Sequence, residues 1–478
     1  MKEKEEKLGI TVKKEDDFSE WYNEVIIKAE LAEHSSIRGF MVIKPRGYRI
    51  WEIIQNYFDA RIKALGVRNA YFPLLIPESF FKKEAEHAEG FAPELAIISE
   101  KEEGVKYAIR PTSETIMYDS YSKWVRSWRD LPLRINQWCN VLRWEVKQCK
   151  LFLRTREFLW QEGHCVYETE EECEKETKMY LNEYKKLCEE LLAIPVIEGE
   201  KTKKERFAGA KRTYALEAFM PDGKALQMGT SHNLGQNFAK AFGIKFLGKD
   251  EKEHVPWQNS WGISTRLIGA VIMMHSDNNG LVLPPKIAPT QIVIVPIFKN
   301  ENKSKVIKKA KEVKRKLRKY EAELDDREGY SPGWKFNEWE LKGVPIRIEI
   351  GPKDIEKKQV VIVRRDNSKK EAVKLGKLNK RVEEILYVTQ VSLYDKAKRF
   401  LKANTVEAKD WNEFLKHIEN RKLVRVFFCG DVKCEDEIKD KSNGATSRVI
   451  PFEQPKNLDR CFNCNKDGKH LVYFAKAY

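Results

Sequence analysis

The sequence predicts three folded parts: an α+β domain, a smaller α/β domain and a small C-terminal α+β domain. Three observations predict this division. From Tyr107 to about His275, β-branched and aromatic runs are separated by Gly, Pro and Asn turns. The segment from Leu281 to Gln291 carries three prolines and is typical of a linker. Beyond it, short apolar strands alternate with helices, which indicates an α/β domain, and a cysteine-bearing tail follows.

The individual elements follow from hydrophobic periodicity. Helices are expected at 18–31, at 48–65, at 170–192, where charges are spaced for i,i+4 pairs, and at 303–323, which is basic and amphipathic. Strands are expected at 70–77, 291–298, 344–351 and 359–366.

Composition and charge limit the classes of protein. The 478 residues are 42% hydrophobic, enough for about three domains, and no apolar run approaches the length of a membrane span. The first 17 residues are charged with both signs and lack the apolar core of a signal peptide, so we expect a solvated extension on a cytosolic protein. The net charge of +15 fits a polyanionic partner, although a Lys/Glu-rich solvated surface explains it equally well.

Four of the nine cysteines lie in the tail, as Cys429-x4-Cys434 and Cys461-x2-Cys464. Two such pairs match a closed tetrahedral thiolate site, which predicts a structural Zn²⁺. Four free thiols are the alternative. The other five cysteines are scattered through apolar or helical segments and are expected to be buried or inert.

The most informative motif is Arg143-Trp-Glu145 followed by Arg154-Thr-Arg-Glu-Phe158. Arginines on two antiparallel strands, with a carboxylate and an aromatic ring, suit a nucleoside triphosphate: guanidinium groups grip phosphate, and the ring stacks on a base. A salt-bridged sheet with a core phenylalanine is the alternative. Downstream, Gly262-Ile-Ser-Thr-Arg266-Leu-Ile-Gly269 supplies a third arginine at the start of an apolar helix.

Together with the 48–65 helix and the strand that ends near Pro73, these segments resemble motifs 1, 2 and 3 of the class II aminoacyl-tRNA synthetases. Further strings resemble the prolyl-tRNA synthetase family, in its archaeal and eukaryotic-type group with a C-terminal zinc module. They are Arg110-Pro-Thr112-Ser113-Glu114-Thr115, Trp160-Gln-Glu162-Gly-His164, Arg206-Phe207-Ala-Gly-Ala and Gln227-Met-Gly229-Thr230-Ser231-His232. The resemblance covers the chain from about Phe18 to Tyr478. It implies an antiparallel catalytic sheet flanked by helices, an α/β anticodon-binding domain and a zinc-binding domain.

The resemblance also implies the activity and the residues that carry it. Proline is activated with ATP and Mg²⁺ to prolyl-adenylate and is then transferred to tRNA(Pro). Proline binding is implied for Thr112, Glu114, Arg143, Trp160, Glu162, His164, Phe207, Ser231 and His232. ATP binding is implied for Arg143, Glu145, Arg154, Thr155, Phe158, Gln227, Thr230, Ser264 and Arg266. Arg143, Arg154 and Arg266 are the expected catalytic residues, and the acid near the site, Glu217, is a candidate ligand of Mg²⁺.

The expected boundaries are an extension at 1–17, a catalytic domain at 18–283, an anticodon-binding domain at 284–403 and a zinc-binding domain at 404–478. Anticodon contacts are expected near exposed strand ends, at Glu349, Lys353, Asp354, Arg364 and Arg365. The family implies a homodimer through motif 1. The short segment between motifs 2 and 3 leaves no room for a cis-editing domain.

Two alternatives stay open on the sequence. One is a sister class II synthetase for threonine, histidine, glycine or serine, which the pocket strings disfavour. The other is a non-catalytic tRNA-binding protein on the same scaffold, which would not need all three arginines.

Overall fold

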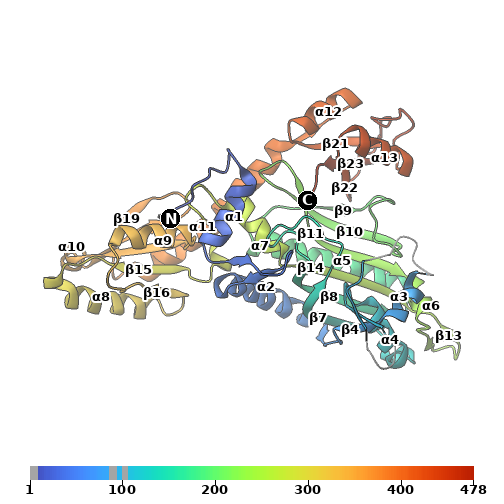
Figure 1. Cartoon of the computed structure of the whole chain (residues 1–478), viewed down its shortest axis with the longest axis horizontal. Coiled ribbons are helices and arrows are strands. Elements are labelled where there is room, and N and C mark those ends of the chain that lie inside the picture. The colour runs from blue at the N-terminus through green and yellow to red at the C-terminus, as the bar shows by residue number, and fades with distance from the viewer. Residues whose placement is uncertain (1–8, 86–93, 100–105) are drawn as a thin grey trace.

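The computed structural model describes residues 9–85, 94–99 and 106–478. Figure 1 shows a central body, built mainly from the first 280 residues, with the α/β domain on one side of it and the C-terminal domain above it. In the described part of the chain, no helix is both long and apolar enough to cross a membrane.

One sheet of eleven strands joins the body to the C-terminal domain, in the order β20-β21-β23-β22-β9-β10-β11-β14-β8-β7-β3. The body supplies β3 (Arg68–Asn69), β7 (Leu133–Leu142), β8 (Glu157–Tyr167), β9 (Ile197–Glu200), β10 (Arg212–Phe219), β11 (Ala225–Gly235) and β14 (Trp257–Ser264). From β9 to β7 every neighbouring pair is antiparallel. The expected antiparallel catalytic sheet is therefore confirmed.

Helices cover one face of this sheet and form the largest core. They are α1 (Phe18–Lys28), α2 (Pro45–Ala64), α5 (Glu170–Lys186), continued by a π-helical turn (Leu187–Leu191), and α7 (Arg266–His275). Trp51, Phe58, Tyr180 and Trp261 are among the fully buried rings of this core. Gly163 in β8 is required here, because a Cβ on it would lie 2.1 Å from the Trp261 ring.

The second face of the sheet meets α4 (Glu114–Trp124) and α6 (Asn237–Ala241) through another apolar cluster that includes Tyr118, Leu234 and Phe238. Short peripheral elements complete the body: β1 (Ala32–His34), β2 (Met41–Ile43), β4 (Leu75–Pro77), α3 (Glu78–Ala85), β5 (Ile97–Ser99), β6 (Lys106–Ile109), β12 (Phe246–Leu247) and β13 (Glu253–His254).

The α/β domain has a mixed five-stranded sheet in the order β16-β15-β17-β18-β19. Its strands are β15 (Ile292–Pro296), β16 (Ala322–Leu324), β17 (Ile346–Ile350), β18 (Gln359–Arg364) and β19 (Lys370–Lys374), and its helices are α8 (Lys303–Lys316), α9 (Pro332–Leu341), α10 (Pro352–Glu356) and α11 (Leu378–Asn404). β15 is parallel to both neighbours, which confirms the α/β class. The helix expected at 303–323 ends at Lys316, because the chain turns back to pair β16 with β15.

The C-terminal domain contains β20 (Thr405–Glu407), α12 (Trp411–Glu419), β21 (Leu423–Phe428), α13 (Val432–Lys441), β22 (Thr446–Pro451) and β23 (His470–Ala475). It continues the body sheet, because Ile450 and Pro451 of β22 pair with Glu200 and Gly199 of β9. A Cβ on Gly199 would lie 2.1 Å from the Ile450 carbonyl oxygen, so only glycine permits this approach.

The described part of the predicted extension, residues 9–17, is mostly exposed but is also held against the body; its first eight residues lie outside the described chain. Thr11 hydrogen-bonds to Glu24 of α1 through its amide and hydroxyl, both at 2.7 Å. The Lys14 ammonium donates to the carbonyls of Met273 and Ser276, and burial lowers the pKa of Lys14 to about 8. Thr11 thus attaches the segment to α1, and Lys14 attaches it to the end of α7.

Candidate active site

A cavity of about 460 Å³ lies on the face of the central sheet opposite α5. It is lined by alternate residues of β8 and by further residues of β11 and β14, together with the start of α4, the β7–β8 connection and the loop before β10. Side chains alternate between the faces of a strand, so Trp160, Glu162 and His164 point into the cavity while Gln161 hydrogen-bonds to Tyr184 of α5.

Eleven of the residues predicted from the sequence line this one cavity: Thr112, Glu114, Arg143, Glu145, Trp160, Glu162, His164, Phe207, Gln227, Thr230 and His232.

The floor of the cavity is an internally satisfied chain of polar groups. His164 Nε2 lies 2.9 Å from Glu162 Oε2, and its Nδ1 lies 3.0 Å from the Tyr118 hydroxyl. Glu162 Oε1 also accepts hydrogen bonds from Ser113 and Gln137. Burial opposes both charges, yet these bonds lower the pKa of Glu162 and raise the pKa of His164, which stabilises them as an ion pair.

One wall of the cavity is aromatic and neutral. The rings of Phe207 and His232 lie 4.7 Å apart, and His232 Nδ1 is 3.0 Å from the Thr213 hydroxyl. Burial, assisted by the charge of His164, lowers the pKa of His232 to about 3, so the ring carries no charge at neutral pH. Such a wall fits a small apolar group.

Glu114 supplies a negative charge at the edge of the cavity. It is the first residue of α4, it is only 4% exposed, and it accepts a hydrogen bond from the Thr112 hydroxyl. No Lys, Arg or His of the described residues forms a salt bridge with it. A buried carboxylate without a cationic partner is suited to an ammonium ligand.

Arg143, on the β7–β8 connection, lines the same cavity as Glu114. Its guanidinium sits 5.2 Å from the Phe158 ring centroid and 5.7 Å from that of Trp160. Burial lowers the pKa of Arg143, while Glu145, Glu114 and Glu162 oppose that shift. Within the described chain it has no salt-bridge partner, so its charge remains available for a carboxylate or phosphate.

The remaining predicted ATP residues lie next to the cavity rather than in its lining. Arg266 donates to the carbonyls of Leu153 (3.2 Å) and Gln227 (3.4 Å), and burial, followed by the charge of Arg143, lowers the pKa of Arg266 to about 10. Arg154 is exposed on the β7–β8 connection. The Thr155 hydroxyl donates to the Glu157 carbonyl at 2.6 Å, and Ser264 Oγ accepts from the Arg266 amide at 3.3 Å.

Two sequence predictions are wrong. Ser231 faces away from the cavity: its hydroxyl donates to the Thr177 carbonyl of α5 at 2.7 Å, because it alternates with Thr230 and His232 along β11. Glu217 is not a free acid near the site. It forms a buried cluster with Lys201 at 2.7 Å and Arg448 of β22 at 2.8 Å, which leaves it no charge for Mg²⁺.

Sequence reasoning missed Glu205 and Ser260 in the lining of the cavity and four side chains that hold other lining residues in position. Thr213 holds His232, while Gln137, Ser113 and Tyr118 hold Glu162 and His164. Gln137 could be assigned to the site only from the pairing register of β7 and β8, which sets it opposite Glu162. No local sequence motif predicts that register.

The four tail cysteines come together as predicted. Their sulfur atoms lie within 4.8 Å of one another, with Sγ–Sγ distances of 3.8 Å for Cys434–Cys461 and 3.6 Å for Cys429–Cys464. Three are buried and Cys464 is partly exposed. Four converging thiols with no histidine or carboxylate fit a closed, structural Zn²⁺ site.

Three family models match the chain. The tRNA synthetase class II core domain (G, H, P, S and T) matches residues 97–275, the anticodon binding domain matches 291–385, and the prolyl-tRNA synthetase C-terminal model matches 411–478. A proline--tRNA ligase of Alkaliphilus oremlandii is 53% identical over 467 residues, 97% of this chain and 96% of the relative. A proline--tRNA ligase 2 of Bacillus cereus is 49% identical over 99% of this chain and its own full length.

The chain belongs to the proline--tRNA ligase family. Class II synthetases of this kind use ATP with Mg²⁺ and act on tRNA, and the expected core, anticodon-binding and C-terminal parts are all present.

In this family's anticodon-binding domain, the predicted exposure of Glu349 and Arg365 is wrong. Arg365 donates to both carboxylate oxygens of Asp277 (2.8 and 2.6 Å) and to the Glu340 carbonyl, which fixes the domain to the segment after α7. Glu349 is buried and paired with Arg347 at 3.0 Å.

The other three predicted anticodon residues lie nearer the surface. Arg364 is half-buried and pairs with Asp366 at 2.7 Å. Asp354 accepts the Gly351 amide at 3.0 Å and so caps α10. Lys353 is exposed on α10, with no ion pair to a described residue.

Proposed function

We propose that this chain joins L-proline to tRNA(Pro) in two steps, with the 460 Å³ cavity as the activation site. One observation carries the proposal. A single cavity is lined by the carboxylate of Glu114 and the guanidinium of Arg143, neither in a salt bridge with a described residue, and by the neutral aromatic wall of Phe207 and His232. An amino acid with an ammonium, a carboxylate and a small apolar ring complements this arrangement.

The proline pocket consists of the floor, the aromatic wall and Glu114. Glu114 accepts the secondary ammonium, with the Thr112 hydroxyl beside it. Phe207, His232 and Trp160 surround the pyrrolidine ring, and the Glu162–His164 pair holds the floor rigid. A neutral His232 suits an apolar ring, because a charged imidazolium would have to be desolvated.

The ATP site extends from Arg143 across β11 and α7. Phe158 and the Arg143 guanidinium stack on the adenine, and Glu145 Oε2, which is buried without a hydrogen-bond partner in the described residues, accepts from its amine. Gln227 and Thr230 contact the ribose side of the nucleotide. Arg154 and Arg266 bind the distal phosphates, while Thr155 and Ser264 hold the backbone of these arginine-bearing segments.

The chemistry requires no nucleophilic side chain. The proline carboxylate attacks the α-phosphate of the Mg²⁺–ATP complex in line, the α–β bridging P–O bond breaks, and pyrophosphate leaves. Arg143 neutralises charge on the α-phosphate while Arg266, held by two backbone carbonyls, faces the leaving group. The terminal 3′-hydroxyl of tRNA then attacks the prolyl carbonyl, losing its proton, and AMP departs.

The other parts of the proposal concern recognition and architecture. Cys429, Cys434, Cys461 and Cys464 hold a structural Zn²⁺ that cross-links the turns around α13. Lys353, Asp354 and Arg364 contact the anticodon. The catalytic domain spans 18–283, the anticodon-binding domain 284–403 and the zinc-binding domain 404–478; the protein forms a homodimer through motif 1 and has no cis-editing domain.

ATP–pyrophosphate exchange, with each amino acid offered separately and without tRNA, tests the proposal. Exchange with proline alone supports the site as assigned. Exchange with another amino acid would refute the pocket, and no exchange from folded, zinc-loaded protein would favour a non-catalytic tRNA-binding scaffold.

A further inference from the structure

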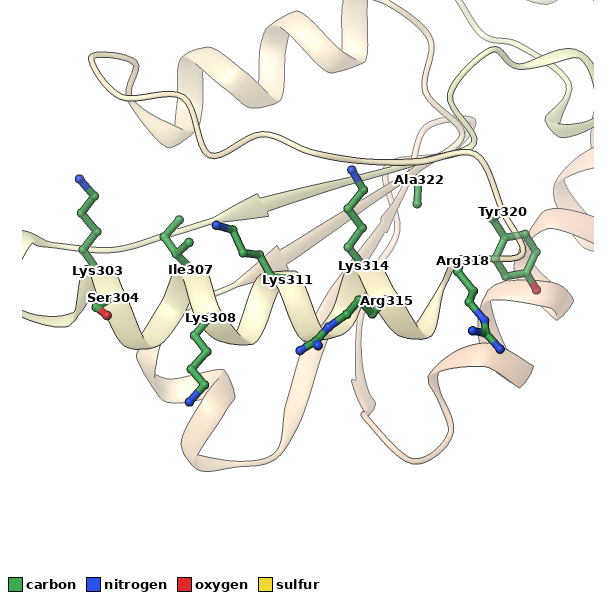
Figure 2. A pocket seen from close by; sticks show the side chains of 10 residues that line it. All are labelled: Lys303, Ser304, Ile307, Lys308, Lys311, Lys314, Arg315, Arg318, Tyr320 and Ala322. Atoms are coloured by element: carbon green, nitrogen blue, oxygen red, sulfur yellow. The ribbon is translucent and has the colours of Figure 1, made fainter.

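A basic groove of about 990 Å³ runs along the exposed side of α8. Figure 2 shows that its cationic side chains come from successive turns of this helix and, for Arg318, from the turn that follows it. Lys311 and Lys314 extend on the side of Ala322, the first residue of edge strand β16, while Lys308 and Arg315 extend on the other side. The opposite face of α8 is anchored in the domain core through Val306, Ala310 and Val313.

Most of the positive charge on this segment has no ion-pair partner among the described residues; Lys303, Lys309 and Lys319 pair with Glu328, Glu312 and Glu383. Ten residues between 303 and 319 are Lys or Arg and one, Glu312, is acidic, a net charge of +9 against +15 for the whole chain. Lys303 pairs with Glu328. The other five cations that line the groove, namely Lys308, Lys311, Lys314, Arg315 and Arg318, form no salt bridge with any described carboxylate.

This concentration of charge works against the helix itself. Lys311 lies three residues after Lys308, three before Lys314 and four before Arg315, so like charges are neighbours along α8. Each such pair destabilises a helix by roughly 0.2–0.5 kcal/mol, whereas an interspersed glutamate would relieve it. A multivalent anion in the groove would remove the repulsion.

The shape of the groove favours an extended anion. From Lys303 to Lys316 the helix rises about 20 Å at 1.5 Å per residue, which matches several consecutive phosphates of a nucleic acid strand. The apolar lining of Ile307, Tyr320 and Ala322 gives sugar edges a surface to lie against. Bases need not be read here, because lysines contact phosphates as point charges.

The position of the groove is also informative. α8 begins beside α10, the helix that carries Lys353, and both lie at the end of the α/β domain remote from the body (Figure 1). From there α8 runs back towards the edge strand β16. A nucleic acid strand that leaves α10 would therefore follow the groove.

We propose that the basic groove along α8 binds the phosphodiester backbone of tRNA and supplies sequence-independent affinity, separate from the base contacts expected at α10. This inference rests on the proposed function, since it takes tRNA as the partner. An acidic protein segment is the competing occupant, and the experiment distinguishes the two.

The experiment measures binding of the full-length protein to tRNA(Pro) transcript between 50 and roughly 200 mM salt, the range over which phosphate contacts dominate the change in affinity. The test variant is Lys311→Gln/Lys314→Gln, in the groove. The matched control is Lys305→Gln/Lys316→Gln, which removes the same charge from exposed positions of the same helix outside the groove. Gln and Lys have similar helix propensity, so α8 stays formed.

The groove variant should lower the slope of log K against log salt by about 1.5, roughly 0.7–0.9 for each lost phosphate contact, and should weaken a non-cognate tRNA equally. The control should change the slope by clearly less. Equal slopes for the two variants, or loss of binding to polyglutamate but not to tRNA, would overturn the proposal. Proline-dependent exchange without tRNA is measured on the same preparations, and its absence from wild type would count against the proposed function while the binding slopes still decide the groove.

Discussion

The arginines of the cleft differ from five arginines of the anticodon-binding domain that lie outside the basic groove in whether a carboxylate neutralises them. Arg143, Arg154 and Arg266 form no salt bridge in the described chain, although burial lowers the pKa of two of them. In the anticodon-binding domain, Arg327, Arg347, Arg364, Arg365 and Arg381 each pair with a carboxylate at 3.0 Å or less. An unpaired buried charge lowers stability and is retained where a bound ligand neutralises it. A charge paired with a carboxylate of the protein helps to hold the fold together.

The largest expected effect comes from removing an unpaired cation. Arg143→Ala should reduce proline-dependent ATP–pyrophosphate exchange by at least about 10³-fold, because one guanidinium faces both substrates. Arg381→Ala, which removes an arginine already paired with Glu371 and Glu384, is the control and should retain exchange. Substantial exchange in the Arg143 variant would remove the proposed mechanism.

The four-cysteine cluster, like the cleft arginines, is expected to be completed by a bound ligand, in this case Zn²⁺. Chelation of Zn²⁺, or Cys434→Ser, should unfold the C-terminal domain, because binding of a structural zinc is worth roughly 10 kcal/mol or more of folding free energy. The measurement combines zinc content with thermal unfolding. Cys188→Ser, a buried cysteine of the body, is the control and should keep its zinc. Well-folded wild-type protein with no zinc would refute the site.

Removing the carboxylate partner of a paired arginine should lower stability rather than catalytic activity. Asp277→Asn leaves the buried Arg365 without its carboxylate and should destabilise the domain junction by about 1–2 kcal/mol, a modest figure because Asp277 is 43% exposed. Thermal unfolding and limited proteolysis near 281–291 measure the effect. Glu371→Gln at the exposed Arg381 pair should change stability by less than about 0.5 kcal/mol. Equal effects from the two substitutions would contradict the assigned role of Arg365.

The smallest expected effect concerns Lys353, an exposed cation of the anticodon-binding domain with no ion pair in the described chain. Lys353→Ala should raise KM for tRNA about 3- to 10-fold, the loss of one charged contact, with proline activation unchanged. Lys357→Ala, at the end of the same helix, should leave KM near wild type. A parallel loss of proline activation in the Lys353 variant would indicate a structural role instead.

Local strings predicted those parts of the site that depend on residue type and short spacing. The two cysteine pairs converge, and Arg143, Glu145 and the Trp160-to-His164 string line one cavity, whereas Arg154 and Arg266 lie outside its lining. Ser231 failed because three consecutive strand residues cannot share one face, a rule that the sequence alone would have supplied.

The failures at Arg365 and Glu217 have a different cause. Their partners, Asp277 and Arg448, lie 88 and 231 residues away in the sequence. No local sequence pattern predicts such a distant ion pair. The end of α8 at Lys316 likewise depended on pairing between β16 and β15, because tertiary pairing overrides helical periodicity.

The pairing of β9 with β22 affects how the chain folds while it is being synthesised. Glu200 and Ile450 are paired strand neighbours about 250 residues apart in the sequence. At a synthesis rate of about 5–20 residues per second, a nascent chain would hold the β9 edge open for on the order of 10 to 50 s before β22 emerges. An open edge is a template for pairing with another chain, so newly made copies on neighbouring ribosomes are exposed to mispairing during that interval. Slower translation should lengthen it.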